Sequence, residues 1–328
     1  MHDPAGEFQF IADRGDARLR LDQVLVRRVT AVTHLSRNVA QRWIEAGAVT
    51  INGRAARRPS DRVVEHAAIH VTLPPDTILR SVPEPEQAPL DILYEDAYLI
   101  AVNKPPGVVV HPTYKRLSGT LLNAVLWHVR ERDDVSPGIL TRLDKDTSGI
   151  VVVALSGSVH AALQRDAAAG RVRKEYLAVV HGVPRPGAGV IREPLGRDPG
   201  DRRRVIVTPG GAASETRYEV IESLPGNLSL VRCELVTGRT HQIRVHLSSS
   251  GWPIVGDPLY GSSHAGTDLM SRQALHAWRI SLAHPVTREP LVIEAPLPRD
   301  WSIDVNVSND SNDTNDSNDS NVLKRSTD

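Results

Sequence analysis

Thr141-Arg-Leu-Asp144-Lys-Asp-Thr-Ser-Gly149 runs without interruption into Ile150-Val-Val-Val-Ala154. The first part is charged and turn-forming, and the second is apolar and mostly β-branched, which is typical of a loop that enters a buried strand. A carboxylate held at the mouth of a sheet beside Arg and Lys can stay ionised in a partly dry cleft and act as nucleophile or base. Asp144 is therefore a catalytic candidate. The alternative interpretation is an Asp-rich turn that makes ordinary caps and ion pairs.

Strands predominate over helices on both sides of this loop. Residues 98–103 and 149–155 have the composition of buried strands, and Ser156 can cap a helix that ends at Gly170. Further strands are predicted at residues 172–180, 216–221, 228–235 and 291–295. Many strands with few helices favour an α+β fold over a doubly wound parallel sheet.

A basic module precedes this region over residues 18–75, where ten Arg face four acidic residues. The first predicted helix rests on the four-residue spacing of Leu21, Leu25 and Val29. The second rests on a Ser36 cap, apolar positions at Val39, Trp43 and Ile44, and a stop at Gly47. Residues 48–51 and 69–73 are predicted strands, with Asn52-Gly53 as a type I′ turn. The module is thus two helices with a small hairpin sheet.

The remaining segments show little periodicity. Residues 1–17 are predicted to be a flexible lead, and residues 76–90 a proline-rich, semi-rigid linker before the catalytic part at residues 91–300. Ser, Asn and Asp repeat through much of residues 301–328, with four Asp and no basic residue between Ser308 and Asn321. Such a tract buries too little apolar surface to offset its ordering entropy, so we predict that it is disordered.

Composition excludes several classes of protein. The net charge is +0 and 40% of the 328 residues are hydrophobic, which rules out a wholly disordered chain. The single cysteine, Cys233, excludes an intrachain disulfide and a cysteine-based zinc or iron–sulfur site. The N-terminus lacks a signal-peptide pattern and no apolar run approaches the ~18 residues that span a bilayer. We therefore expect a cytoplasmic protein without a metal or a membrane partner.

Two further motifs supply candidate pocket residues. Asn103-Lys-Pro-Pro-Gly107 is a rigid turn that can shape one wall of a pocket, although many surface turns have this composition. Lys174-Glu-Tyr176 lies on a predicted strand, whose alternation puts Lys174 and Tyr176 on one face. Tyr176 can stack there on a planar base, and a core tyrosine in a sheet is the alternative.

Two arginine-containing stretches complete the set. Thr237-Gly-Arg-Thr-His-Gln-Ile-Arg244-Val-His246 presents an Arg near apolar residues in either strand or helix geometry. A buried Arg needs a carboxylate partner, so we predict an Arg244–Asp144 pair, with a phosphate-binding or solvated basic patch as the alternative. Arg202, Arg203 and Arg204 are consecutive and point in several directions, which suits either a loop on a phosphate backbone or a solvated charge run.

Together these motifs resemble the RluA/RluD-type family of RNA pseudouridine synthases. Arg142-Leu-Asp-Lys-Asp-Thr-Ser-Gly149 carries the most specific part of the resemblance, and Gly256-Asp-Pro-Leu-Tyr-Gly261 extends the four motifs above in family order. The basic module resembles the S4 RNA-binding domain through Ser36-Arg37, Glu45-Ala-Gly47 and Val49-Thr-Ile-Asn-Gly53. One departure is Thr141, where the family usually has His. If that position contacts RNA, affinity or target choice is expected to differ.

The resemblance implies a reaction that detaches uracil from ribose, turns it and rejoins it through carbon, without a metal, nucleotide or redox cofactor. It implies that Asp144 is the catalytic carboxylate, that Arg244 pairs with it, and that Tyr176 stacks under the flipped uracil. Arg142 is expected to fill the place the base leaves or to contact the backbone. Further RNA contacts are expected at Lys104, Arg37, Arg42, Arg57, Arg58, Arg202, Arg203 and Arg204.

The resemblance leaves the RNA target open. Large-subunit ribosomal RNA is the commonest substrate for this domain arrangement, with transfer RNA as an alternative, and we expect a monomer. A different class, a non-catalytic RNA-binding or ribosome-assembly factor, would fit the basic module and the Arg loops alone. The complete set of Asp144, Tyr176 and Arg244 favours the enzyme, because a protein that only binds RNA does not need it.

Overall fold

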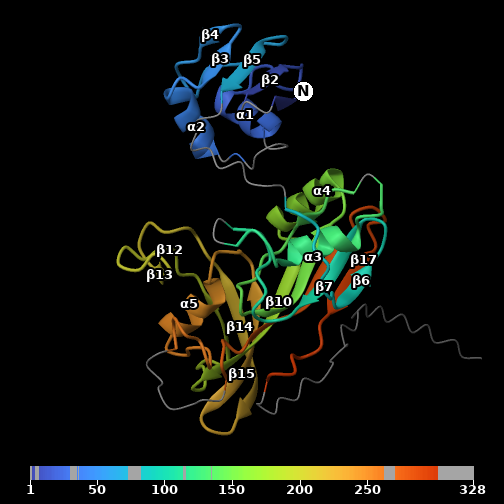
Figure 1. Cartoon of the computed structure of the whole chain (residues 1–328). Coiled ribbons are helices and arrows are strands. Elements are labelled where there is room, and N and C mark those ends of the chain that lie inside the picture. The colour runs from blue at the N-terminus through green and yellow to red at the C-terminus, as the bar shows by residue number, and fades with distance from the viewer. Residues whose placement is uncertain are drawn as a thin grey trace, which may run out of the picture. The chain divides into compact units, whose positions relative to one another are not determined.

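A computed structural model describes residues 2–3, 7–29, 35, 37–72, 83–113, 116–133, 135–261 and 270–301. The contacts within the chain divide it into two units, residues 1–90 with 109–135 and residues 91–108 with 136–328. Figure 1 shows the helices and strands of the chain, coloured by residue number. The predicted boundary at residue 91 coincides with a unit boundary, whereas residues 109–135, predicted to be catalytic, group with the first unit. The Ser36 cap, residues 76–82 of the predicted linker and residues 302–328 of the predicted tail lie outside the described residues.

The first unit contains a small α+β domain. Two helices, α1 (Leu21–Val29) and α2 (Arg37–Glu45), share a buried cluster with one sheet. The sheet is antiparallel in the order β1-β2-β5-β3-β4, with β1 (His2–Asp3), β2 (Glu7–Ile11), β3 (Val49–Ile51), β4 (Arg54–Ala55) and β5 (Ala68–Thr72). The residues at the predicted helical spacing, Leu21, Leu25, Val29, Trp43 and Ile44, are buried, which confirms both helices.

Positive φ angles confirm the predicted turn and helix stop. Asn52 has φ of 50° and Gly53 has φ of 75°, as a type I′ turn between β3 and β4 requires. Gly47 has φ of 75° just after α2, and its N–H donates to the carbonyl of Ile44 at 3.1 Å. A glycine adopts this left-handed conformation without the steric cost that a Cβ would add.

The prediction of a flexible lead over residues 1–17 is wrong for residues 7–17. Residues 7–11 form β2, which pairs with β5 from Glu7–Thr72 to Ile11–Ala68. Phe8 and Phe10 pack against the buried cluster of the domain, and Asp16 is fully buried. The strand has only two large aromatic residues as a local signal, and its partner β5 lies far along the chain, so its pairing is invisible in the sequence of the segment itself.

Asp22 connects the two helices of this domain. Its buried carboxylate accepts hydrogen bonds from three side chains. Nε of Arg20 donates at 3.1 Å, Nε of Arg37 at 3.1 Å and Nε2 of Gln41 at 2.8 Å. Burial raises the pKa of Asp22, but the hydrogen bonds from Arg20, Gln41 and Arg37 lower it more, so the pKa lies well below its ordinary value of 3.8. The carboxylate therefore stabilises the domain in its charged form.

We expect Asp22→Ala to destabilise this domain by about 1–3 kcal/mol, because the donors around it lose a charged acceptor. The folded-state pKa is depressed, so the contribution is complete above the unfolded-state pKa and is lost as the pH falls through the folded-state value. Urea unfolding of the parent and the variant at neutral pH measures the loss of stability, and the same comparison below pH ~3 shows whether the difference shrinks. Equal stability of the variant and the parent at neutral pH would contradict the role of Asp22.

Residues 83–90 are attached to a helix of the same unit, α3 (Leu121–His128). The Asn123 amide donates to the carbonyl of Glu84 at 2.7 Å, and the backbone N–H of Glu86 donates to the carbonyl of Asn123 at 3.0 Å. The described end of the predicted linker is therefore fixed by hydrogen bonds, which explains why residues 109–135 group with this unit.

The second unit is built on a ten-stranded sheet with the order β11-β14-β15-β10-β16-β9-β7-β6, to which β17 adds beside β16 and β8 beside β9. Among the described strands of this sheet, β9 and β16 pair in parallel, and the other pairs are antiparallel. The fold is therefore α+β with a mixed, largely antiparallel sheet, as predicted. The strands are β6 (Ile92–Glu95), β7 (Leu99–Lys104), β8 (Gly138–Ile139), β9 (Ser148–Ala154), β10 (Arg173–His181), β11 (Ala188–Ile191), β14 (Thr216–Leu224), β15 (Leu228–Leu235), β16 (Leu275–Ala283) and β17 (Pro290–Glu294).

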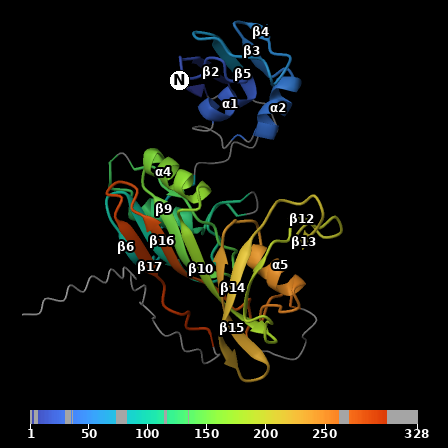
Figure 2. The same ribbon diagram turned by 180° about the vertical axis from the view of Figure 1, so that it is seen from behind.

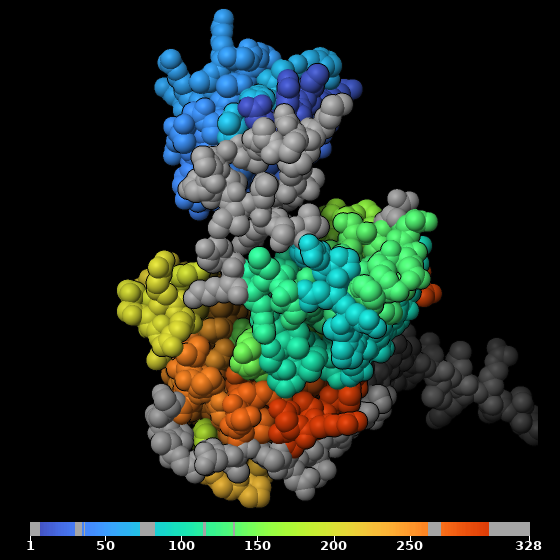
Figure 3. All heavy atoms as spheres, in the orientation of Figure 1, coloured from blue at the N-terminus to red at the C-terminus, as the bar shows by residue number. Residues whose placement is uncertain are grey.

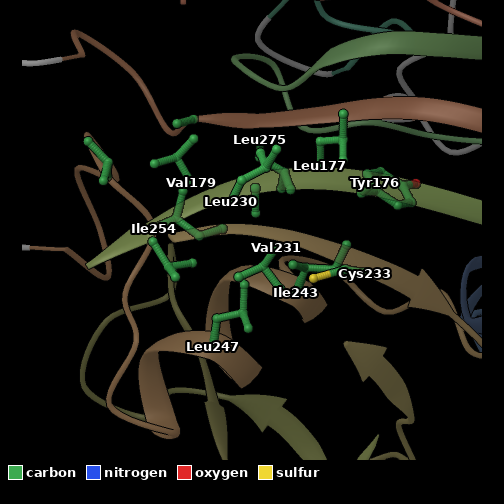
Figure 4. Close-up of a cluster of buried hydrophobic side chains, with 14 of the residues drawn as sticks. Tyr176, Leu177, Val179, Leu230, Val231, Cys233, Ile243, Leu247, Ile254 and Leu275 are labelled. Atoms are coloured by element: carbon green, nitrogen blue, oxygen red, sulfur yellow. The ribbon is translucent and has the colours of Figure 1, made fainter. Parts of the chain in front are cut away.

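Two helices pack on this sheet, α4 (Gly157–Ala168) beside β9 and α5 (Gln242–Ser249) beside β14 (Figure 2). Ser156 caps α4 as predicted, accepting from the N–H of Val159 at 3.3 Å. Ile243 and Leu247 of α5 belong to the same buried cluster as Val231 and Cys233 of β15 (Figure 4). A separate hairpin, β12 (Leu195–Arg197) and β13 (Val205–Val207), contacts α5. The helix α5 is thus held between the sheet and this hairpin.

Candidate active site

The loop that carries Asp144 is held by its own backbone and by the start of β9. The N–H of Thr147 donates to the carbonyl of Asp144 at 3.1 Å, which closes a turn. Gly149 has φ of 109°, and a Cβ at this position would collide with the carbonyl oxygen of Ala277 in the neighbouring β16. Only glycine permits this close approach, so the loop is fixed where β9 enters the sheet.

Arg244 joins Asp144 to a second carboxylate. Its Nη1 donates to Oδ2 of Asp144 at 2.8 Å, which confirms the predicted pair. Its Nε and Nη2 donate to Oδ2 and Oδ1 of Asp257 at 2.7 and 2.9 Å, in a bidentate geometry. Arg244 is only 4% exposed, so the alternative of a solvated basic patch does not hold for this residue. Burial lowers the pKa of the guanidinium, but Asp257 and Asp144 raise it above its ordinary value.

Asp257 is a site residue that sequence reasoning missed. Its side chain is fully buried, and its Oδ1 also accepts from the N–H groups of Leu259 and Tyr260 at 2.9 and 3.1 Å. A sequence signal for Asp257 was present in Gly256-Asp-Pro-Leu-Tyr-Gly261, where a single acid stands between a glycine and a proline in a turn. Because Asp257 shares the charge of Arg244, one guanidinium holds Asp144 in place while remaining anchored itself.

Tyr176 closes the pocket from the sheet side. It lies on β10 with 6% exposure, and Figure 4 shows its hydroxyl pointing away from the aliphatic cluster. Burial, and then the charge of Asp144, raise the pKa of the phenol above its ordinary value, which keeps the hydroxyl protonated. Tyr176 thus belongs to the core cluster, as the alternative interpretation states, and it also lines the pocket.

The pocket brings together the predicted catalytic set and several residues that were not predicted. Asp144 is partly exposed, with 25% of its side chain accessible, and Arg142 is exposed at the same pocket. The lining consists of Arg142, Leu143, Asp144, Thr147, Tyr176, Leu235, Arg239, His241, Gln242, Ile243, Arg244 and Leu275. The arrangement offers one carboxylate balanced by a guanidinium, a phenol and apolar walls, which suits a planar, polar-edged ligand.

Lys104 does not lie where the sequence analysis placed it. It is 0% exposed, which rules out a direct RNA contact in this structure. Its Nζ donates to the carbonyls of Pro105 and Lys145 at 2.8 and 2.9 Å, and the N–H of Gly107 donates to the same Lys145 carbonyl at 2.9 Å. Burial lowers the pKa of Lys104 to about 7, against the opposing charge of Asp146. The Asn103–Gly107 turn therefore supports the Asp144 loop from behind.

Arg272 supports the same loop from another side and was also missed. It is buried, and its Nη1 donates to the carbonyl of Asp146 at 3.1 Å while Nη2 donates to Oγ of Ser148 at 3.3 Å. The carboxylate of Asp300 balances the charge of Arg272, whose Nε donates to Oδ2 of Asp300 at 2.6 Å. Thr141 is also structural, because its buried hydroxyl accepts from the N–H of Val152 at 3.1 Å. This departure from the family pattern thus faces β9.

The other predicted RNA-contacting residues have different environments. Arg42, Arg57 and Arg58 are exposed and make no ion pair within the described residues, whereas Arg37 pairs with Asp22. In the hairpin loop, Arg202 is exposed and Arg203 pairs with Asp201 at 2.7 Å. Arg204 lies with its guanidinium 5.4 Å from the ring centre of Tyr260 and its Nε 3.9 Å from Oδ2 of Asp198. The three consecutive Arg therefore do point in different directions, as predicted.

Two stretches of the chain match known protein families. A family model described as RNA pseudouridylate synthase matches residues 98–249, and one described as S4 domain matches residues 19–69. A protein of Bacillus subtilis (strain 168), named uncharacterized RNA pseudouridine synthase YlyB, is 40% identical over 274 residues, 81% of this chain and 87% of the relative. The chain belongs to the RNA pseudouridine synthase family. Its enzyme class is therefore that of an isomerase acting on RNA, as predicted.

Two further comparisons cover most of this chain. The ribosomal large subunit pseudouridine synthase D of Neisseria meningitidis serogroup B is 40% identical over 293 residues, covering 86% of this chain and 76% of the relative. The solved structure of human RNA pseudouridylate synthase domain containing 1 has a TM-score of 0.55 and 28% identity, covering 69% of this chain and 93% of that chain. Within the described ranges, no helix has the length and apolarity to cross a membrane.

Proposed function

We propose that this pseudouridine synthase isomerises specific uridines of large-subunit ribosomal RNA, with Asp144 as the catalytic carboxylate. The observation that carries the proposal is the pairing of Asp144 with a buried Arg244 in a pocket closed by Tyr176. The substrate class is supported by the 40% identical relative from Neisseria meningitidis, whose name specifies the large ribosomal subunit. A synthase acting on transfer RNA is the second candidate.

In the proposed reaction the bond between N1 of uracil and C1′ of ribose breaks and a bond between C5 and C1′ forms. The hydrogen of C5 leaves as a proton and N1 takes up a proton from solvent, so the atoms balance. Asp144 serves as nucleophile on the sugar or the ring, or as the base that removes a sugar proton. All three routes need a carboxylate with one oxygen free for the nucleotide. Arg244 provides this arrangement, because its hydrogen bond occupies Oδ2 of Asp144.

Tyr176 and Arg142 have supporting roles in the proposal. The target uridine must leave its stack, at a cost of a few kcal/mol. A ring on β10 at the pocket offers a stacking surface for the uracil, and an exposed Arg142 at the same pocket can occupy the space that the base leaves. The S4 domain and the arginines of the β12–β13 hairpin supply binding energy outside the pocket.

The test is release of tritium from the C5 position of uridine in RNA. Large-subunit ribosomal RNA and transfer RNA transcripts, each labelled with [5-³H]uridine, are incubated with the protein, and the released tritium is counted. We expect release from ribosomal RNA. Release from transfer RNA alone would reassign the substrate, and binding without release from either RNA would favour the non-catalytic assembly factor.

We also propose that the protein acts as a monomer in the cytoplasm. The pocket is lined by residues of one unit of a single chain, so a second copy is not needed to complete it. The single cysteine, Cys233, cannot form an intrachain disulfide, which agrees with a compartment that keeps thiols reduced. Light scattering of the purified protein with and without RNA measures the mass, and a stable dimer would contradict the monomer.

The exposed arginines of the S4 domain are expected to set the salt dependence of RNA binding. Replacing Arg42, Arg57 and Arg58 together by Gln should weaken binding and reduce the slope of log K against log salt by ~0.7–0.9 for each phosphate that the domain no longer neutralises. Filter binding from low to moderate salt measures the slope. Arg279→Gln, which removes one arginine that is paired with Glu294 outside this domain, is the control. An unchanged slope in the triple variant would refute RNA docking by this domain.

A further inference from the structure

His241 occupies an unusual position between Asp144 and the β12–β13 hairpin. It immediately precedes α5 with φ of 55°, in the left-handed region that non-glycine residues rarely adopt. Its side chain is only 16% exposed and lines the pocket. One ring nitrogen, Nδ1, lies 2.9 Å from the hydroxyl of Tyr260, and the other, Nε2, lies 3.9 Å from Oδ2 of Asp144. The proposed reaction does not yet assign this residue a role.

The hydrogen bonds around Tyr260 favour one tautomer of His241. The backbone N–H of Val205 donates to the Tyr260 hydroxyl oxygen at 2.9 Å. That oxygen can then direct its own hydrogen to Nδ1 of His241, which leaves the N–H of a neutral imidazole on Nε2. This N–H faces the carboxylate of Asp144. Burial lowers the pKa of His241, although the charge of Asp144 opposes it, so the neutral form is favoured.

The contacts on the far side of Tyr260 come from the hairpin. Val205 begins β13, and the preceding Arg204 lies over the Tyr260 ring at 5.4 Å from its centre. Arg244 lies 5.1 Å from the same ring centre. Nε of Arg204 is buried, has no hydrogen-bond partner within the described residues, and lies 3.9 Å from Oδ2 of Asp198, at the limit of an ion pair. Figure 3 shows the hairpin, in yellow, projecting beyond α5 at the surface of this unit.

We propose that His241 is a positioning residue for Asp144, set by the β12–β13 hairpin through Tyr260. The inference rests on the proposed function, because it requires RNA to dock on the arginines of the hairpin loop. A movement of roughly 1 Å would bring Nε2 of His241 within the ~2.7–3.2 Å of an N–H···O bond to Oδ2 of Asp144. With Arg244 and His241 both on Oδ2, the other oxygen, Oδ1, is aimed at the nucleotide. Engagement of RNA outside the pocket is thereby linked to the orientation of the catalytic carboxylate.

The test uses two substitutions at His241 that differ in reach. Asn tolerates the left-handed backbone and can keep a side-chain contact with Tyr260, but it is too short to reach Asp144. Gln places an amide N–H near the position of Nε2. We expect His241→Asn to lower kcat by ~10- to 100-fold, the loss typical of a reacting group misplaced by about 1 Å. We expect KM to change by less than about twofold, and His241→Gln to recover most of kcat.

A second pair of variants tests the connection to the hairpin. Tyr260→Phe removes the hydroxyl that orients His241 and should lower kcat, whereas Tyr98→Phe, an exposed tyrosine remote from the pocket lining, should not. Arg204→Gln should lower kcat in the parent but have little further effect in Tyr260→Phe, because both act through one contact. Tritium release from [5-³H]uridine RNA under saturating and limiting RNA gives kcat and KM separately.

The outcomes distinguish this inference from the proposed function. A parent protein that releases no tritium overturns the proposed function and with it the role of His241. A parent that is active while His241→Asn keeps its kcat overturns the positioning role alone. A fall in activity of His241→Asn that lies wholly in KM, or that His241→Gln does not recover, also overturns it, since either result would indicate RNA binding or local folding. Reduced kcat with unchanged KM, recovered by Gln, supports it.

Discussion

Asp144→Asn is expected to abolish pseudouridine formation while leaving the fold and RNA binding intact. Asn is isosteric with Asp, and its amide oxygen can still accept the hydrogen bond from Nη1 of Arg244. What the substitution removes is the negative charge, and with it the capacity to act as nucleophile or base. Loss of a general base alone reduces turnover by ~10²–10⁴-fold, and loss of a nucleophile reduces it further.

The measurement combines tritium release with two controls. Thermal unfolding and RNA affinity of Asp144→Asn should match the parent, since Asp144 is partly exposed and its charge is already partly solvated. Asp146→Asn changes the charge by the same amount two residues along the same loop, and it should retain most activity because Arg272 contacts the Asp146 carbonyl and not its side chain. Pseudouridine produced by Asp144→Asn at the parental rate would end its assignment as the catalytic carboxylate.

The elements that could be predicted from sequence are those whose signals are local. β9 and β15 have apolar runs bounded by turn residues, and α1 has its buried residues at helical spacing, so each could be identified without knowing its partner. The pair between Asp144 and Arg244 could be inferred because a buried guanidinium requires a carboxylate and Asp144 was the best candidate. That inference is chemical rather than positional, which explains why it holds across a sequence separation of 100 residues.

The elements that could not be predicted depend on contacts between distant segments. β2 is a strand because β5 pairs with it, and the central β16 was missed because His276, Trp278 and Arg279 obscure its alternation. Lys104 was predicted to contact RNA, but it is buried and two backbone carbonyls accept its protons, although a lysine is rarely buried without an acid. Asp257 and His241 were missed because a sequence cannot show that Arg244 binds two carboxylates, or that Tyr260 connects the hairpin to the pocket.

Arg244→Met is expected to cost the second unit about 3–5 kcal/mol of stability, because it leaves the fully buried carboxylate of Asp257 without its counter-charge. Met has a similar length and no charge, so packing is largely conserved. The same substitution frees Asp144 to turn toward solvent, and we expect turnover to fall by about 100-fold or more, as for a misplaced reacting group. Urea unfolding and tritium release measure the two effects on the same protein.

A double variant separates the two roles of Arg244. Adding Asp257→Asn to Arg244→Met removes the buried charge, and the Asn side-chain oxygen can still accept from the N–H groups of Leu259 and Tyr260. Most of the lost stability should therefore return. Activity should not return, because Asp144 still lacks the donor that holds its Oδ2. If the double variant regained turnover along with stability, Arg244 would act only as a structural counter-charge to Asp257. The catalytic carboxylate would then need another explanation for its placement.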